Sequence, residues 1–272
     1  MPIISSFGAG SARGYGLTAG GFKGMCATGG TISNDGVYRI HTFNGAGTFT
    51  VSALSPDSDF NKVDYAVVAG GGGGIHGGGG AGGFRQSSGV LTGGYAVSPL
   101  GACVASLPVS ATGYPIAVGA GGSNNAGTLG CAGSPSSFQS ISASGGGGGG
   151  GRNQNGGPGG SGGGGGDYGP QSGGSGSAGQ GNPGGNGGPH EAGGSGGGAT
   201  AVGGNFSPAT GGGAGATTSI SGSSVIYSFG GNGDCGAAPP AGHDTPNPGS
   251  GFGGQDQRTA DGGSVIIRYR FK

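Results

Sequence analysis

Residues 145–200 contain 31 glycines in 56 positions and no Val, Ile, Leu, Phe or Met. Such a tract cannot build a hydrophobic core. A flat sheet of glycine would also be weak, because glycine loses more backbone entropy on ordering than any other residue. Two states remain for the tract. One is a flexible Gly/Ser linker, and the other is a bundle of extended helices with three residues per turn, the polyproline-II shape built from glycine.

The spacing of the other residues in this tract favours the bundle. In Gly156–Gly166, Pro183–Pro189 and Ala192–Ala199, a residue other than glycine occurs at every third position over short spans. One such helix has no internal hydrogen bonds, so its amides must pair with neighbouring segments, and glycine permits the close approach. Asn, Asp, Pro, Ser or Gln follows each run and favours a turn. We therefore expect a folded-back stack of polyglycine-II helices.

Alternating β-forming residues outside the tract predict strands. Val37–Phe43 and Thr48–Leu54 form a predicted hairpin around a Gly-containing loop, and Val63–Ala69 is a predicted buried strand that runs into five glycines. Further candidates are Tyr114–Val118, Ser137–Ser142, Thr217–Ser221, Ser224–Phe229 and Ser264–Phe271. Helical periodicity is missing almost everywhere. The sequence thus predicts a mainly β fold with essentially no α-helix, in which strands accompany the polyglycine-II stack.

The distribution of charged and apolar residues argues against nucleic acid and membrane as partners. The ten Lys and Arg residues balance ten Asp and Glu residues and form no basic cluster. Because phosphate binding needs clustered cations, we expect no nucleic-acid partner. The apolar stretches are too short to span a bilayer, and the first residues lack the pattern of a secretory signal, so we expect neither membrane insertion nor signal-directed export.

Motifs for catalysis or cofactor binding are also missing. The patterns of the type GxGxxG are no more frequent than this glycine content produces by chance, and none opens a helix. The chain has four cysteines, and they are too far apart for a CxxC site. Either all four are small buried thiols, or two of them form one disulfide bridge. They are Cys26, Cys103, Cys131 and Cys235. His190–Glu191 and His243–Asp244 could each form a metal or acid–base pair, but a site needs rigid support that this composition does not supply. We predict no catalysis, no cofactor and no metal site.

Surface recognition is the remaining function class. Short irregular segments between the glycine tracts bring the few aromatic and charged residues of the central region to loop positions, where a rigid stack could present them as a binding tip. Each of these segments could equally be a simple turn. The candidate receptor-binding residues are Tyr168, His190, Glu191, Phe206, His243 and Asp244. Tyr168 and Phe206 come first among them, because aromatic residues dominate binding surfaces.

The order of several motifs supports a family resemblance. These motifs are GTFTV (Gly47–Val51), VDYAVVAGGGGG (Val63–Gly74), GGGGAGGF (Gly77–Phe84), YPIAVGAGG (Tyr114–Gly122), SPSSF (Ser134–Phe138) and GGSVIIRYRF (Gly262–Phe271). Over residues 40–272 the chain resembles the glycine-rich domain common in tail and fibre proteins of bacteriophages. It is more loosely similar to tail-fibre tip adhesins of T-even-like phages, in which a polyglycine-II sandwich carries receptor-binding loops at its end. Because segment 142–192 has a long insert of glycine tract, no receptor residue is carried over.

The resemblance implies a virion protein, a tail fibre or fibre-tip adhesin that is made in the host cytoplasm and binds the host cell surface. Its implied partners are other virion proteins of the tail, baseplate or capsid, further copies of itself in a homo-oligomer, with a trimer favoured, and a host surface glycan or outer-membrane protein. Two alternatives stay open. One is a capsid-surface decoration or fibre protein, and the other is a glycine-rich cellular surface or ice-binding protein.

With this interpretation as a virion protein, we divide the chain into four parts. Residues 1–30 would attach the protein to the virion, with Ile3, Ile4, Phe7 and Tyr15 as the residues to bury, although a frayed terminus is the alternative. Residues 31–144 would form a β-rich domain with short glycine loops, and residues 145–262 the polyglycine-II region with exposed loops. Residues 263–272 would return to the β-rich domain as a C-terminal strand.

Overall fold

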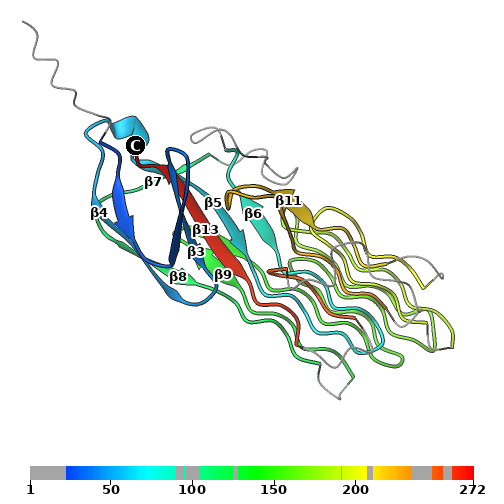
Figure 1. Ribbon diagram of the computed structural model, residues 1–272. Helices are drawn as coiled ribbons and strands as arrows, with labels where there is room; N and C mark the ends of the chain where they lie inside the picture. Colours follow the sequence, from blue (N-terminus) through cyan, green and yellow to red (C-terminus); the bar gives the residue numbers. More distant parts are fainter. Residues whose placement is uncertain are drawn as a thin grey trace, which may run out of the picture.

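The structure is a computed structural model, and it describes residues 23–89, 95, 105–124, 128–190, 192–206, 211–233, 247–253 and 259–272. Figure 1 shows an elongated molecule with β-sheets at one end and undulating glycine-rich segments at the other. The described elements are β1 (Cys26–Thr28), β2 (Thr31–Asp35), β3 (Tyr38–Phe43), β4 (Gly47–Ala53), the 3-10 helix η1 (Ser58–Phe60), β5 (Lys62–Val68), β6 (Phe84–Gln86), β7 (Leu107–Pro108), β8 (Gly113–Ala117), β9 (Ser136–Phe138), β10 (Ile141–Ala143), β11 (Ala216–Thr218), β12 (Val225–Tyr227) and β13 (Ser264–Arg270). The predicted mainly β fold with essentially no α-helix is confirmed for these residues.

The strands form three antiparallel sheets. A six-stranded sheet has the order β2-β3-β13-β5-β6 with β7 paired to β5, a five-stranded sheet has the order β1-β4-β8-β9-β10, and β11 pairs with β12. The C-terminal strand β13 lies between β3 and β5, so that Ile267 is opposite both His41 and Tyr65. The last strand of the chain therefore holds two early strands together.

Side-chain alternation along β13 creates a hydrophobic core on each face of the six-stranded sheet. Val265, Ile267 and Tyr269 lie in the first core, whereas Ile266 lies in the second. The first core also includes Phe49, Val51, Ile116 and Phe138 from the five-stranded sheet. The second includes Ala199, Ile220 and Tyr227 at and around the β11–β12 pair. The three sheets are therefore three packed layers.

The two strands of the predicted hairpin, Val37–Phe43 and Thr48–Leu54, occur as β3 and β4, but their predicted pairing with each other is wrong. β3 pairs with β2 and β13, whereas β4 pairs with β1 and β8 in the other large sheet. Phe43 and Phe49 give the physical reason, because both rings are buried in the core between the two sheets. The loop between these strands therefore connects two facing sheets, and the apolar residues of β3 and β4 approach each other across the core.

Other strands differ from prediction in extent. The predicted strand Ser137–Ser142 is a hairpin of β9 and β10, because Gln139 adopts φ 51° and reverses the chain. Strands occur where they were predicted for β5, β8, β11, β12 and β13, but several are shorter. The short or polar strands β1, β2, β6 and β7 were missed, since pairing with neighbours rather than a hydrophobic pattern defines them.

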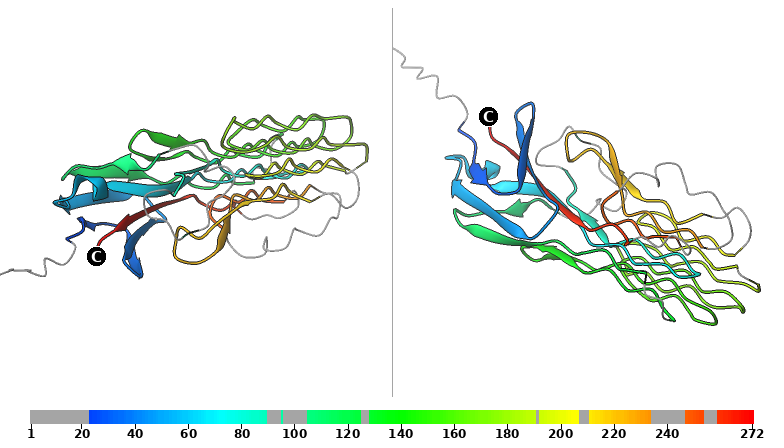
Figure 2. Two further views of the ribbon diagram at one scale, coloured as in Figure 1. Left: turned by 90° about the horizontal axis from the view of Figure 1, so that it is seen from above. Right: turned by 60° about the horizontal axis from the view of Figure 1, so that its bottom comes forward.

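The glycine-rich segments run away from the sheets and back again, side by side (Figures 1 and 2). In segment 77–83 the backbone donors rotate among three neighbours. Residues 77, 80 and 83 donate to segment 144–150, residues 78 and 81 to segment 194–197, and residues 79 and 82 to segment 249–252. A donor period of three is what the predicted polyglycine-II bundle requires. The helical conformation of each segment stays a prediction.

Backbone fills the interior of this bundle. Segments 69–74, 77–83 and 145–151 are buried almost throughout, although they consist nearly entirely of glycine. Their amide groups bond to neighbouring segments, so burial leaves few backbone donors without a partner. The bundle thus replaces a side-chain core with hydrogen-bonded backbone.

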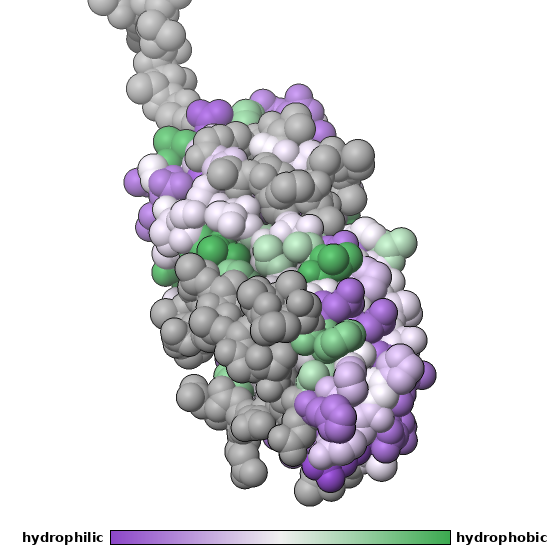
Figure 3. All heavy atoms as spheres, turned by 90° about the vertical axis from the view of Figure 1, so that its right-hand side faces the viewer, coloured by the Kyte–Doolittle hydropathy of each residue, from purple (hydrophilic) through white to green (hydrophobic). Residues whose placement is uncertain are grey.

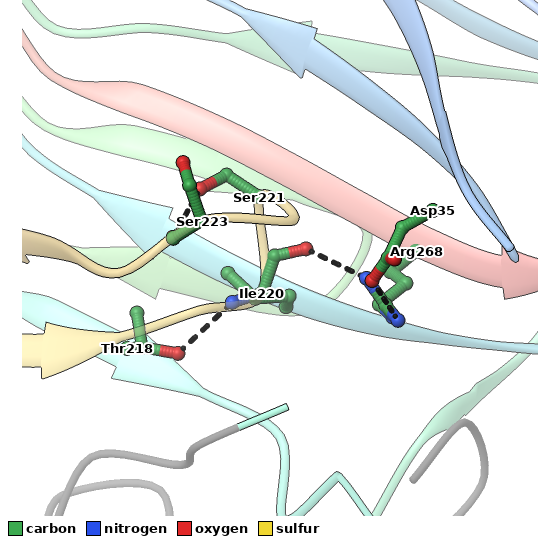
Figure 4. A network of polar contacts seen from close by, with 6 residues as sticks. All are labelled: Asp35, Thr218, Ile220, Ser221, Ser223 and Arg268. Carbon is green, nitrogen blue, oxygen red and sulfur yellow. Dashed lines mark hydrogen bonds and ion pairs between the residues drawn. The ribbon is translucent and has the colours of Figure 1, made fainter. Parts of the chain in front are cut away.

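A buried arginine connects the layers at the sheet end (Figure 4). Arg268 on β13 is 1% exposed, and its Nη2 donates to Oδ2 of Asp35 at the end of β2 at 2.8 Å. Its Nη1 lies 3.5 Å from the carbonyl oxygen of Ile220, in the loop between β11 and β12, and its guanidinium lies 4.6 Å from the centre of the Tyr38 ring. The arginine therefore fixes two sheets relative to each other.

Candidate functional site at the distal turns

The glycine-rich segments reverse direction at the end of the molecule farthest from the sheets, which we call the distal end (Figure 1). The hydrogen bonds from Gly157 to Gly148 and from Gly160 to Gly145 show that two such segments are antiparallel, so the residues between them form a turn. Antiparallel pairing recurs between the other successive segments. Residues far apart in the sequence therefore meet in adjacent distal turns.

Five side chains from four turns form what we call the distal cluster: His76, Arg152, Asp167, Tyr168 and His190. The guanidinium carbon of Arg152 lies 4.4 Å from the centre of the Tyr168 ring, and Nη2 donates to the Tyr168 hydroxyl at 3.4 Å. The ring of His190 is 6.4 Å from that of Tyr168, centre to centre. The Arg152 side chain is 57% exposed and Tyr168 is 43% exposed, so both face solvent while they contact each other.

Asp167 lies beneath these exposed groups. Its side chain is fully buried, and neither carboxylate oxygen accepts a hydrogen bond. Oδ2 lies 3.4 Å from Nδ1 of His76 and 3.9 Å from Nε of Arg152. A buried carboxylate is costly unless nearby positive charge compensates it. The carboxylate therefore holds the guanidinium of Arg152 by electrostatic attraction.

The backbone of the distal turns adopts an uncommon conformation. Asn153, Tyr168 and His190 have φ values of 53°, 61° and 52°. For residues other than glycine this left-handed region costs about 1–3 kcal/mol each, and such residues gather at functional sites. Among the described residues, only Gln139 and Ser228 share this feature outside the distal turns. The turns thus hold an aromatic and a histidine side chain at the cost of backbone strain.

The structure brings together some of the predicted receptor-binding residues. Tyr168 and His190 both lie in the distal cluster. Phe206 lies beside it, because its ring packs against Gly188 and its amide donates to the Asn186 carbonyl at 2.9 Å. The predicted residues outside the described part of the chain are Glu191, His243 and Asp244, together with Ile3, Ile4, Phe7 and Tyr15 of the predicted attachment segment.

Sequence reasoning did not select His76, Arg152 or Asp167. Arg152 and Asp167 do stand at the start of two irregular segments between glycine tracts, and they are charged residues in a region that has few. That scarcity is the signal that could have found them. Their pairing across two turns has no signal in the sequence, because it depends on which segments become neighbours.

On the face that Figure 3 shows, the described residues of the distal end form no large continuous apolar surface. Figure 3 shows hydrophilic and weakly polar surface there, with small separate hydrophobic areas. The exposed large apolar residues of the glycine-rich part are Leu129, Tyr168, Val202 and Phe206. The turns therefore offer isolated anchors within a polar surface.

The described cysteines are free thiols, and one of them lies at the surface. Cys26 is exposed and Cys131 is half-buried, while Cys103 and Cys235 lie outside the described residues. The alternative of four buried thiols is therefore wrong, because alternation along β1 buries Ala27 and turns Cys26 outward.

Within the described ranges, no three His, Cys, Asp or Glu side chains come close enough to hold a metal ion. The same residues include no helix with the length and apolarity needed to cross a bilayer.

A family model described as a glycine-rich domain matches residues 42–270. This range begins in β3 and ends at the last residue of β13, so it takes in the bundle and most of both large sheets. The chain belongs to this family. No curated protein and no solved structure matches the chain. The extent of the match indicates that the glycine-rich domain is one unit of sheets and bundle together.

Proposed function

We propose that this glycine-rich domain is a non-enzymatic virion protein, a bacteriophage tail fibre or fibre-tip adhesin, whose distal turns bind the host cell surface. The observation that carries this proposal is the distal cluster, in which Arg152, Tyr168 and His190 are exposed at one end of an elongated molecule. The order of motifs, which resembles that of phage glycine-rich domains, supports the virion context.

The construction of the bundle supports an adhesive role. Its interior consists of hydrogen-bonded glycine backbone, so a change of side chain inside it would disturb several neighbouring segments. Most side chains of the turns, such as those of Arg152 and Tyr168, are instead exposed, so their replacement would disturb fewer neighbours. A rigid support with turns that tolerate substitution suits a protein that must bind a variable surface.

The opposite end suits attachment to the rest of the particle. The C-terminal residues leave the six-stranded sheet there, next to the β2–β3 turn, where Phe271 donates to the Val37 carbonyl at 3.0 Å. In this proposal the sheet end contacts other virion proteins, as a homo-oligomer with a trimer favoured. The protein is made in the host cytoplasm and incorporated into the virion.

Adsorption of assembled particles tests the proposal. Particles that carry both Arg152→Ala and Tyr168→Gly should adsorb to host cells at least tenfold more slowly than wild type, because the two main exposed anchors are lost. Val202→Ala is the control, since Val202 is 62% exposed in the glycine-rich part but does not belong to the distal cluster. Normal adsorption by the double variant would overturn the proposal. Antibody labelling of the particles in the electron microscope should place the protein at a fibre tip.

A further inference from the structure

The distal cluster is electrically balanced. Arg152 and Asp167 carry opposite charges, and the atoms Nε and Oδ2 lie 3.9 Å apart. The carboxylate therefore partly compensates the charge of the arginine before any ligand arrives, although it shares its Oδ2 with His76. An anionic ligand would gain little attraction at this site and would approach a buried carboxylate. The balance favours a ligand without net charge.

The exposed groups of the cluster combine one ring with several hydrogen-bonding groups. Tyr168 presents a large, rigid surface whose ordering costs little side-chain entropy. Arg152 lies over one face of that ring and supplies hydrogen-bond donors next to its hydroxyl group, and Asn153 and His190 are exposed beside it. A ligand that fits this arrangement has an apolar face and a rim of hydroxyl groups.

The size of the surface argues against a protein as the main ligand. A stable protein–protein interface covers roughly 800 Å² on each partner and has clustered apolar anchors. In the described turns, only two aromatic residues are exposed, Tyr168 and Phe206, and their neighbours in the sequence are mostly Gly, Asn, Gln and Ser. A sugar ring needs only a few well-placed groups.

We propose that the distal cluster binds a neutral saccharide of the cell surface, with Tyr168 against a face of the sugar ring and Arg152 donating hydrogen bonds to its hydroxyl groups. This inference rests on the proposed adhesin function. Asp167 acts as a positioning residue, because it holds the guanidinium in place without reaching the surface.

Treated cells test the inference separately from the function. Periodate cleaves the vicinal diols of saccharides, whereas protease removes surface proteins. Particles should lose most of their adsorption to periodate-treated cells and keep it on protease-treated cells. If the Arg152→Ala and Tyr168→Gly particles adsorb poorly but only protease removes wild-type adsorption, the adhesin function stands and the saccharide is wrong. If those variants adsorb normally, the function itself fails.

Competition with polysaccharide extracted from the same cells tests whether the bound saccharide is uncharged. The fraction that passes an anion-exchange column should inhibit adsorption, and the retained acidic fraction should not. Inhibition by the acidic fraction alone would overturn the neutral assignment.

Direct binding of the neutral fraction to the purified protein completes the test. Arg152→Ala should weaken binding about tenfold or more, as expected for the loss of a hydrogen bond from a charged group. The matched control is Arg39→Ala, which removes a similar pair at the sheet end, where Arg39 lies 4.2 Å from the centre of the Phe271 ring. Tyr168→Gly removes the ring without adding backbone strain, because glycine adopts the left-handed conformation readily, and circular dichroism of the purified variant checks that it is folded. Equal weakening by the control would contradict the inference.

Discussion

Replacing a single interior glycine by alanine should show whether backbone packing holds the bundle together. Gly79 is the site of choice, because a Cβ atom there would collide with the carbonyl group of Gly72 and lie 3.0 Å from the carbonyl carbon of Gly73. Both belong to neighbouring backbone, which cannot rotate away as the end of a side chain can. Segments 70–74 and 77–83 must therefore separate.

The cost follows from the hydrogen bonds that this separation breaks. Gly72 donates to Gly80 at 2.8 Å and accepts from Phe252 at 3.2 Å. Breaking each of these two bonds leaves a buried group without its partner and costs about 1–3 kcal/mol, and overpacking costs a further 1–3 kcal/mol or so. Gly79→Ala should thus lower the free energy of unfolding by roughly 3–9 kcal/mol, a large part of the about 5–15 kcal/mol typical of a domain.

Two matched substitutions make the measurement decisive. Gly262→Ala should leave stability unchanged or raise it by up to about 1 kcal/mol, because its nearest neighbour is the Gly119 carbonyl oxygen at 3.6 Å and alanine restricts the unfolded chain. Gly83→Ala should be intermediate, since the first atom that its Cβ meets is Oε1 of the Gln180 side chain, which can move.

Denaturant unfolding followed by tyrosine fluorescence measures all three variants, since the chain has eight Tyr and no Trp. If Gly79→Ala and Gly262→Ala differ by less than about 1 kcal/mol in the free energy of unfolding, the reasoning about backbone packing is refuted.

Three further outcomes are expected. Burial lowers the pKa of His41 below 6.5 despite its contact with the Gly29 carbonyl, so the free energy of unfolding should fall as the pH drops below 6.5, because the unfolded state takes up the proton more readily. Denaturant titrations at several pH values measure this, and a His41→Gln variant whose free energy of unfolding falls as steeply with pH would contradict it. Arg268→Ala should destabilise the protein by about 2–5 kcal/mol in thermal unfolding, because it leaves a cavity, whereas Asp35 is 45% exposed and keeps its contact with water. Arg268→Met should cost less, because methionine refills the buried volume, and equal losses would contradict this reasoning. An isolated peptide of residues 145–200 should be disordered by circular dichroism, since its segments bond to residues outside this range; a folded peptide would refute the dependence on neighbouring segments.

Several features could be read from the sequence because they depend on local composition. Glycine and proline interrupt every stretch long enough for a helix, which excludes α-helices. Runs of β-branched and aromatic residues in Ser264–Arg270 and Lys62–Val68 predict two strands, and both are buried almost throughout. The placement of Tyr168 and His190 between glycine tracts also indicates turns, since the tracts themselves can hold no side chain in their interior.

Only the tertiary structure determines which of these segments become neighbours. β3 and β4 look like one hairpin in the sequence, but Phe43 and Phe49 fill a core between two sheets, and that core sets their pairing. Arg152 and Asp167 become partners only because two glycine-rich segments turn back at the same end. The physical reason is that glycine runs are nearly identical locally. Their choice of neighbour therefore depends on hydrogen bonds between distant segments, and a local pattern cannot specify it.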